Sequence, residues 1–227
     1  MADLVITIDG PAASGKSTAA RLLARKLGVS FLDTGAMYRA VTLAAMQDGV
    51  DLNDEKKLLS VTKTHEFQFS VKDDKMTVCI DGTDITEQIR NPQVTANARF
   101  IASAPKVRDK LVQMQRQFAE SQKKIVTEGR DQGTLAFEDA DIKFYLTADL
   151  AERARRRQAE LRIKSGCESL EQIQKAIEER DKSDQKRAFG PLKPAEDAIV
   201  VDTTNLSIEE VVEKLLVYMK EKCLKEN

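Results

Sequence analysis

The first candidate for a reactive segment is a loop near the N-terminus that is bounded by two glycines. The motif G-x-x-x-x-G-K-[ST] is matched by Gly10, Pro11, Ala12, Ala13, Ser14, Gly15, Lys16 and Ser17. The glycines allow a tight turn that aims backbone N–H groups at an anion. Lys16 adds a cation for phosphates, and the Ser17 hydroxyl is a ligand for Mg²⁺. A plain glycine-rich turn is the alternative. The apolar strand before the motif and the helix pattern after it favour a nucleoside triphosphate site.

A second group of reactive side chains follows a short apolar run at residues 29–32. Within seven residues it offers Asp33, Thr34, Tyr38 and Arg39. A guanidinium can donate two hydrogen bonds to a phosphate, and a tyrosine ring can stack on a ligand. A polar loop with Tyr38 packed and Arg39 solvated is the alternative, and this segment alone does not decide between the two.

A third group, at residues 129–134, contains Arg130 and Asp131 and follows a predicted strand that ends at Thr127. Open α/β sheets bind ligands at the carboxyl ends of parallel strands, so this loop is a candidate for binding. A structural Arg–Asp ion pair would also explain it.

A fourth group is strongly basic. Residues 153–164 hold six basic residues and one acid, Glu160. Arg153, Arg156 and Arg157 are spaced to share one helix face. We expect few acidic partners there, so the face should repel itself unless an anion binds, whereas the alternative is a solvated surface helix. The pair at 165–166, Ser-Gly, interrupts the helix pattern, and a further charged segment at 179–187 fits a lid edge or a solvated helix end.

Short apolar strands separated by helical patterns are expected to position these groups. We predict strands at residues 4–8, 29–32, 125–127, 142–146 and 199–201. The first helix should stop at Gly28, and a capping box from Ser207 to Glu210 should start the last. Strands alternating with helices favour parallel pairing, so we predict an α/β fold with a parallel five-stranded sheet flanked by helices.

Residues 63–93 break this alternation. Apolar residues alternate at 67–71 and again at 76–80, with a charged turn between them and a second turn at Asp81-Gly82. We therefore predict a small antiparallel β insert at 63–93 within a core formed by 1–62 and 94–227. We expect residues 96–117 to form a helical connection that carries Arg108, and residues from about 153 to 190 are the candidate for a lid.

Composition narrows the classes of function. The 227 residues carry 36 Lys+Arg and 37 Asp+Glu, so no net positive field favours nucleic acid or a membrane surface. No apolar run is long enough to span a bilayer, and the N-terminus lacks the basic start of a secretory signal. Three cysteines and one histidine disfavour a disulfide scaffold or a zinc site. We expect a cytoplasmic protein, monomeric because no long apolar stripe is left over.

The ordered set of motifs resembles that of the bacterial cytidylate kinases, which transfer a phosphoryl group from ATP to CMP. The likeness covers nearly the whole chain. It rests on IDGPAASGKST (8–18), LDTGAMYR (32–39), PKVR (105–108), EGRDQGT (128–134), ERARRR (152–157), ERDKSDQKRA (179–188) and VVDTTNLSIEEVV (200–212). The resemblance implies a P-loop NTPase-type fold, with the β insert as a nucleoside-monophosphate-binding subdomain and a helical lid.

The resemblance also implies roles for individual residues. ATP would be bound by the loop from Gly10 to Thr18, with Mg²⁺ on Ser17. CMP or dCMP would be bound by Thr34, Tyr38, Arg39, Arg108, Arg130, Asp131, Asp184 and Arg187, with Asp33 near the acceptor oxygen. Within that set, Arg108 and Asp131 would read the cytosine edge and Asp184 would hold the sugar. The catalytic cations would be Lys16, Arg39, Arg130, Arg153 and Arg157.

Two residues depart from the pattern of the resembled family. Arg99 stands where the family often carries a serine that helps to bind the base, so either Arg99 turns away or base selection depends more on Arg108 and Asp131. Gln132 stands where an apolar residue usually follows GRD, which predicts a change in loop packing. A P-loop kinase for another small acceptor such as UMP remains an alternative, as does a nucleotide-dependent switch or nucleic-acid-binding ATPase.

Overall fold

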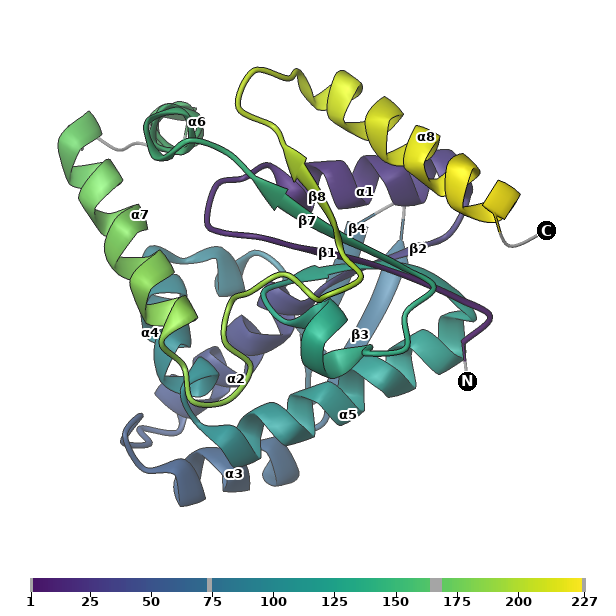
Figure 1. Cartoon of the computed structure of the whole chain (residues 1–227). Coiled ribbons are helices and arrows are strands. Elements are labelled where there is room, and N and C mark those ends of the chain that lie inside the picture. Colours follow the sequence, from purple (N-terminus) through teal and green to yellow (C-terminus); the bar gives the residue numbers. More distant parts are fainter. Residues whose placement is uncertain (1, 73–74, 164–168, 226–227) are drawn as a thin grey trace. The chain divides into compact units, whose positions relative to one another are not determined.

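The computed structural model describes residues 2–72, 75–163 and 169–225 (Figure 1). Its main element is a five-stranded sheet flanked by helices, with strand order β2-β6-β1-β7-β8. The strands are β1 (Leu4–Asp9), β2 (Ser30–Asp33), β6 (Lys124–Gly129), β7 (Ile142–Thr147) and β8 (Ile199–Asp202). Parallel pairing places Ile6 opposite Ile142 and Phe144 opposite Ile199. The predicted parallel five-stranded sheet is confirmed.

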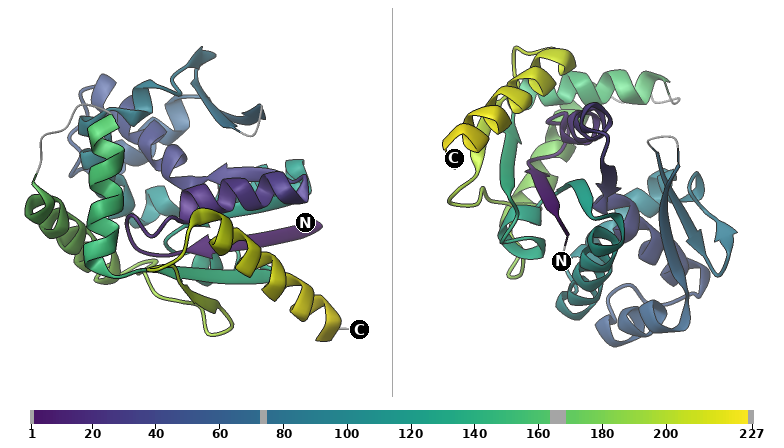
Figure 2. Two further views of the ribbon diagram at one scale, coloured as in Figure 1. Left: turned by 90° about the horizontal axis from the view of Figure 1, so that it is seen from above. Right: turned by 90° about the vertical axis from the view of Figure 1, so that its right-hand side faces the viewer.

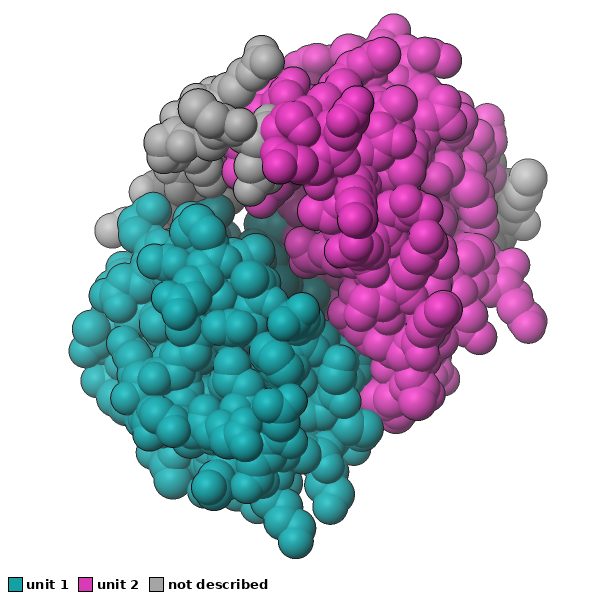
Figure 3. All heavy atoms as spheres, turned by 90° about the vertical axis from the view of Figure 1, so that its left-hand side faces the viewer, with its two compact units in different colours: residues 1–4, 29–127 teal, residues 5–28, 128–227 magenta. Residues whose placement is uncertain are grey.

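The chain divides into two compact units, coloured separately in Figure 3. Unit 1 comprises residues 1–4 and 29–127, and unit 2 comprises residues 5–28 and 128–227. No helix within the described part of the chain combines the length and apolarity that crossing a membrane would require.

In unit 2, the end of one helix and the start of another lie at the residues that the sequence predicts. Helix α1 (Lys16–Leu27) stops at Gly28, whose φ of 66° suits a residue without a side chain. Helix α8 (Ile208–Lys225) starts with the predicted capping box, because the Ser207 N–H donates to Glu210 and the Glu210 N–H donates to Ser207. The two helices pack against each other (Figures 1 and 2).

Unit 2 also contains the helices of the predicted lid, α6 (Leu150–Ile163) and α7 (Leu170–Gln185), which pack side by side. Their shared core consists of Ala154, Ile173 and Ile177, together with Ala12 from the loop after β1. The Ser165-Gly166 break predicted between them lies outside the described residues. A capping box at Ser169 starts α7.

Unit 1 contains the predicted antiparallel insert, with strands β3 (Phe67–Lys72), β4 (Lys75–Ile80) and β5 (Thr83–Asp84). Phe69 pairs with Val78, which confirms the predicted hairpin (blue in Figure 2), although residues 73–74 of its turn are not described. The turn from β4 to β5 places Asp81 and Gly82 at φ values of 50° and 77°, which are typical of a tight hairpin turn.

The remaining helices of unit 1 are α2 (Thr34–Gln47), α3 (Glu55–Thr64), the short η1 (Gln88–Arg90), α4 (Pro92–Ala102) and α5 (Pro105–Gln122). The predicted connection over 96–117 is helical but is divided between two helices, because α4 ends at Ala102 and α5 begins at Pro105. A proline disfavours helical backbone at the residue before it, and Ala104 is indeed extended.

Candidate active site

The glycine-bounded loop joins β1 to α1 and is shaped to bind phosphate. The backbone at Gly10 passes so close to β7 that a Cβ there would lie 2.1 Å from the Leu146 carbonyl oxygen. Gly15, at a φ of 85°, leads directly into α1. The buried Ser14 hydroxyl has no hydrogen-bond partner among the described residues. A loop that leaves a buried donor unused at a helix N-terminus fits an anionic ligand.

Lys16 and Ser17 meet a carboxylate that the sequence analysis did not single out. The Ser17 hydroxyl donates to Glu128 Oε1 over 2.7 Å, and Lys16 Nζ lies 4.0 Å from Glu128 Oε2. Lys16 is buried, and this burial, with Arg130 nearby, lowers the pKa of its ammonium. A hydroxyl and a carboxylate oxygen side by side are ligands that suit Mg²⁺. The available signal was the acid near the end of β6, a strand that leads into a candidate binding loop.

Asp9, also missed by the sequence analysis, fixes the loop after β6. Its two carboxylate oxygens accept from the N–H groups of Gln132 and Gly133, over 2.9 and 2.8 Å. Burial raises the pKa of Asp9 to about 7. Gln132 is buried and starts the π-helical turn η2 (Gln132–Ala136). Gln132 thus lies buried in the same loop that carries Arg130 and Asp131, and the change in loop packing expected from it stays a prediction.

Two predicted arginines of unit 2 contact the carboxylate of a third predicted residue, Asp184. Arg130 Nε donates to Asp184 Oδ2 over 2.8 Å, and Arg187 donates to the other oxygen. Burial opposes ionisation of Asp184, but Arg130 and Arg187 hold its pKa below the usual range. Arg130 therefore pairs with Asp184 from α7, and this contact joins the loop after β6 to the end of α7.

The expectation that the arginine face of α6 lacks acidic partners was wrong. Arg156 Nε donates to Glu152 over 3.1 Å, and Arg157 donates to Glu160 over 3.0 Å. These acids lie one turn away on the same helix, a spacing that brings opposite charges together. Arg153 is buried, and its acid, Asp181, comes from α7.

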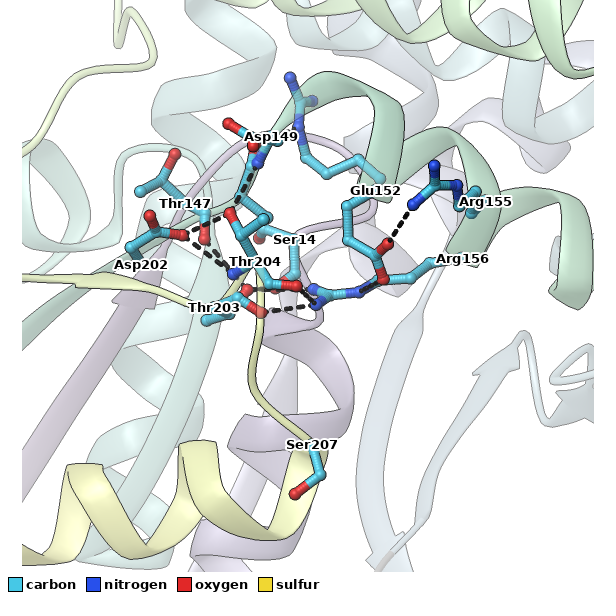
Figure 4. A network of polar contacts seen from close by, with 12 residues as sticks. Ser14, Thr147, Asp149, Glu152, Arg155, Arg156, Asp202, Thr203, Thr204 and Ser207 are labelled. Atoms are coloured by element: carbon cyan, nitrogen blue, oxygen red, sulfur yellow. Dashed lines mark hydrogen bonds and ion pairs between the residues drawn. The ribbon is translucent and has the colours of Figure 1, made fainter.

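A cavity of about 190 Å³ lies beside the phosphate-binding loop. Figure 4 shows Arg156 reaching from α6 to the segment after β8, where it donates to the Thr203 hydroxyl over 3.0 Å and to the Thr203 carbonyl over 2.6 Å. The Thr203 hydroxyl in turn contacts the Ser14 carbonyl over 3.2 Å. The cavity is lined by Ser14, Gly15, Thr18, Arg156, Glu160, Thr203, Leu206, Ile208 and Val211. It combines a guanidinium with apolar side chains, a lining suited to a flat heterocycle.

Unit 1 holds the other predicted residues. Asp33 caps α2, because its Oδ1 accepts from the Ala36 N–H over 2.9 Å, and its Oδ2 lies 3.2 Å from Arg39. Arg39 is mostly buried and its Nε has no hydrogen-bond partner among the described residues, so the alternative of a solvated Arg39 is wrong. A buried, partly unsatisfied guanidinium fits an anion.

The second cation of unit 1 is fully buried. Arg108, on α5, lies over the Tyr38 ring at 5.6 Å and donates to the Ala102 carbonyl over 3.1 Å. Tyr38 and Arg108 therefore form one packed group with Arg39 nearby on α2. Arg99 is exposed and lies over the Phe100 ring at 4.9 Å, and its relation to the base of the nucleotide stays a prediction.

The predicted site residues thus form two clusters, one in each unit. Unit 1 carries Asp33, Thr34, Tyr38, Arg39 and Arg108, and unit 2 carries the remainder of the set. The predicted cooperation of Arg108 with Asp131 joins residues of both units, and it stays a prediction.

Comparisons with known proteins identify the family. The profile of the cytidylate kinase family matches residues 6–221. A cytidylate kinase from Stutzerimonas stutzeri (strain A1501) is 48% identical over 214 residues, which is 93% of each chain. A cytidylate kinase from Caldicellulosiruptor bescii is 44% identical over 216 residues, which is 95% of each chain.

Two solved structures agree with the fold class. A gluconokinase from Sinorhizobium meliloti 1021 has a TM-score of 0.53 at 13% identity and covers 99% of this chain and 98% of its own. A protein from Eubacterium ventriosum has a TM-score of 0.52 at 12% identity, over 96% and 98% of the two chains. Their low identity limits them to the fold. The sequence matches extend over nearly the whole chain and include both clusters, so the chain belongs to the cytidylate kinase family.

Proposed function

We propose that this protein transfers the γ-phosphoryl group of ATP to CMP or dCMP and produces ADP with CDP or dCDP. The observation that carries the proposal is a phosphate-binding loop, with Lys16 and Ser17 beside Glu128, in a chain of the cytidylate kinase family. The odd number of cysteines supports a reducing, cytoplasmic compartment, and we expect a monomer.

Unit 2 would bind the donor nucleotide. Lys16 and the loop N–H groups would hold the β- and γ-phosphates, and the cavity lined by Arg156 and Leu206 would take the adenine ring. Ser17 and Glu128 would hold Mg²⁺, which supplies charge neutralisation on the phosphate oxygens when bound. The Ser17–Glu128 distance of 2.7 Å supports this pairing.

The acceptor would be bound by residues of both clusters. Arg39 and Arg130 would bind the phosphate of CMP, since each guanidinium can donate two hydrogen bonds to it. Arg108 and Asp131 would read the cytosine edge, whose exocyclic amine needs an acceptor. Asp184, with Arg187 beside it, would hold the sugar.

Repulsion between two anionic substrates is the main barrier. A phosphate oxygen of CMP would attack the γ-phosphorus in line, and the bond to the β-phosphate oxygen would break so that ADP leaves with that electron pair. Phosphoryl transfer needs positioning and charge compensation, which the cations Lys16, Arg39, Arg130 and Arg157 would supply. A transition-state arginine contributes roughly 10³–10⁵ in rate in related reactions, or about 4–7 kcal/mol.

The test is initial-rate ADP production with CMP, dCMP, UMP and AMP compared side by side. We expect CMP and dCMP to be the best acceptors, because a site that hydrogen-bonds one base edge rejects an analogue lacking that pattern. UMP has no exocyclic amine and should be poorer. A clear preference for UMP, AMP or a different small acceptor would contradict the proposal and favour the alternative kinase.

A further inference from the structure

Residue Ala12 of the phosphate-binding loop is held by an ion pair between α6 and α7. Arg153, on α6, donates through one terminal nitrogen to the Ala12 carbonyl over 3.1 Å. Asp181, on α7, accepts from the Ala12 N–H over 3.1 Å. The same nitrogen of Arg153 donates to the other oxygen of Asp181 over 2.5 Å. Both polar backbone groups of Ala12 are thus bonded to one ion pair, and we call these three residues the Ala12 network.

The Ala12 network is buried. Arg153 and Asp181 are each 8% exposed, and the Arg153 Nε donates to the Ala148 carbonyl over 3.0 Å. Apolar residues of α6 and α7 pack on Ala12, namely Ala154, Ile173 and Ile177. Removing one partner from such a pair leaves a buried charge uncompensated, whereas exposed pairs contribute little. The network is therefore a strong contact between the loop and both helices.

The next residue of the loop, Ala13, has a backbone conformation that the surrounding structure must impose. Ala13 has a φ of 59°, in the left-handed region that costs an L-residue energy. Such a residue persists only where its surroundings fix it. Ala13 also packs against the core shared by α6 and α7. The contacts made by these two helices are the surroundings that can fix it.

We propose that Arg153 and Asp181 are positioning residues that hold the phosphate-binding loop in its triphosphate-binding shape and thereby link helices α6 and α7 to ATP binding. The inference rests on the proposed function, because it takes ATP as the ligand of the loop. It assigns Arg153 a different role from the phosphate contact that the resemblance implies. Its guanidinium already donates to Ala12, Ala148 and Asp181.

The first test compares nucleotide affinities by isothermal titration calorimetry. Asp181→Asn keeps the size of the side chain but loses one acceptor for Arg153, and Arg153→Lys keeps the charge but loses the fork of donors. We expect each to raise the Kd for ATP about tenfold and to leave the Kd for CMP within about twofold. Lys182→Gln and Arg155→Gln remove exposed charges from the same helices and are the matched controls.

A second test separates positioning from a merely structural role. In the wild-type protein, bound ATP should slow amide hydrogen exchange in α6 and α7, and Asp181→Asn should lose that protection. The double variant Arg153→Met with Asp181→Leu removes both buried charges and can fold stably. We expect it to keep its melting temperature and still bind ATP weakly.

The outcomes distinguish the two proposals. Wild-type ATP affinity in the folded double variant, or in both single variants, would overturn the inference and leave the proposed function intact. Failure of the wild-type protein to bind ATP would instead contradict the proposed function. If the single variants do not fold, the affinity of the double variant decides.

Discussion

At the scale of single residues, the candidate site contains buried charges that are arranged in pairs of opposite sign. Lys16 faces Glu128, and Arg130 faces Asp184. Each pair compensates a charge that would be costly to bury alone. Arg39 is only partly compensated by Asp33, since its Nε has no partner among the described residues. An anionic substrate would complete these groups, so removing one of them should lower turnover.

Lys16→Ala removes the cation of the phosphate-binding loop. We expect kcat to fall by about 10³ or more, because charge compensation of the transferring phosphoryl group is lost. A coupled ADP assay measures the rate, and calorimetry should show an unchanged Kd for CMP. A rate within about tenfold of the wild type would contradict the role of Lys16.

Glu128→Gln keeps the size of the side chain and an acceptor for the Ser17 hydroxyl but removes a negative charge. We expect the Mg²⁺ concentration for half-maximal rate to rise about tenfold, because hard cations prefer anionic oxygen ligands. The measurement is the rate against free Mg²⁺ at fixed ATP. Glu196→Gln, at an exposed position of the same unit, is the control. An unchanged Mg²⁺ dependence would exclude Glu128 from the metal site.

At the scale of elements, turns and caps position the clusters. Asp33 places Arg39 by capping α2, and Gly10 lets the loop pass close to β7. His65, which follows α3, joins Asp48 at the end of α2 to Asp81 in the turn after β4. Each of these contacts lies at or beside the end of a helix or a strand.

Gly10→Ala should lower the free energy of unfolding more than the same change at Gly49 does. The added Cβ would lie 2.1 Å from the Leu146 carbonyl, so the loop or β7 must shift. At Gly49, φ is 65° and nothing lies within 4 Å, so only the backbone penalty of about 1 kcal/mol remains. We expect Gly10→Ala to lose about 1–3 kcal/mol more, measured by urea unfolding. Equal losses would show that the close approach is not a constraint.

His65 should make the stability of unit 1 depend on pH. Its Nδ1 lies 2.6 Å from Asp81 and its Nε2 lies 3.0 Å from Asp48, and these hydrogen bonds raise the pKa of His65. The stabilisation is fully present below the unfolded-state pKa of about 6.5 and is lost as the pH rises through the raised folded-state value.

The variant His65→Gln tests this dependence. We expect it to lose about 1 kcal/mol of unfolding free energy at about pH 6, where the wild-type ring is protonated and Asp81 is ionised, and almost nothing at high pH, where the ring is neutral. Urea unfolding at several pH values measures the difference. Because the chain has a single histidine, its one NMR titration curve gives the folded-state pKa directly. A pKa at or below the usual value would contradict the assignment.

At the scale of the whole molecule, the proposed function assigns residues of both clusters to one pair of substrates. Unit 1 carries Arg39 and Arg108, and unit 2 carries the phosphate-binding loop. Because the two clusters belong to different units, a binding measurement in solution tests whether they act on one ligand together.

A bisubstrate analogue, cytidine and adenosine joined by five phosphates, measures this joint action. We expect it to bind at least about 100-fold more tightly than ATP or CMP alone, because linking two ligands makes the second binding event intramolecular. Calorimetry measures the three affinities. Arg39→Ala should remove most of the gain. Binding no tighter than that of ATP would show that the clusters do not engage one ligand together.

Patterns in the sequence were enough to predict the five strands of the main sheet, the hairpin of the insert and the phosphate-binding loop. These features depend on local signals, such as apolar periodicity, Gly28 after α1 and the Ser207 capping box. The break at Ala104, which the sequence analysis did not place, is also local, because it depends on the backbone restriction imposed by Pro105.

Which charged groups contact one another, in contrast, depends on how the chain folds in three dimensions. Glu128 and Asp9 contact residues of the predicted binding loops, and Arg153 donates to the backbone carbonyl of Ala12. Their partners lie more than a hundred residues away along the chain, so no local pattern relates them. Burial then determines their effect, because a charge removed from water must be compensated by whichever group the fold places beside it.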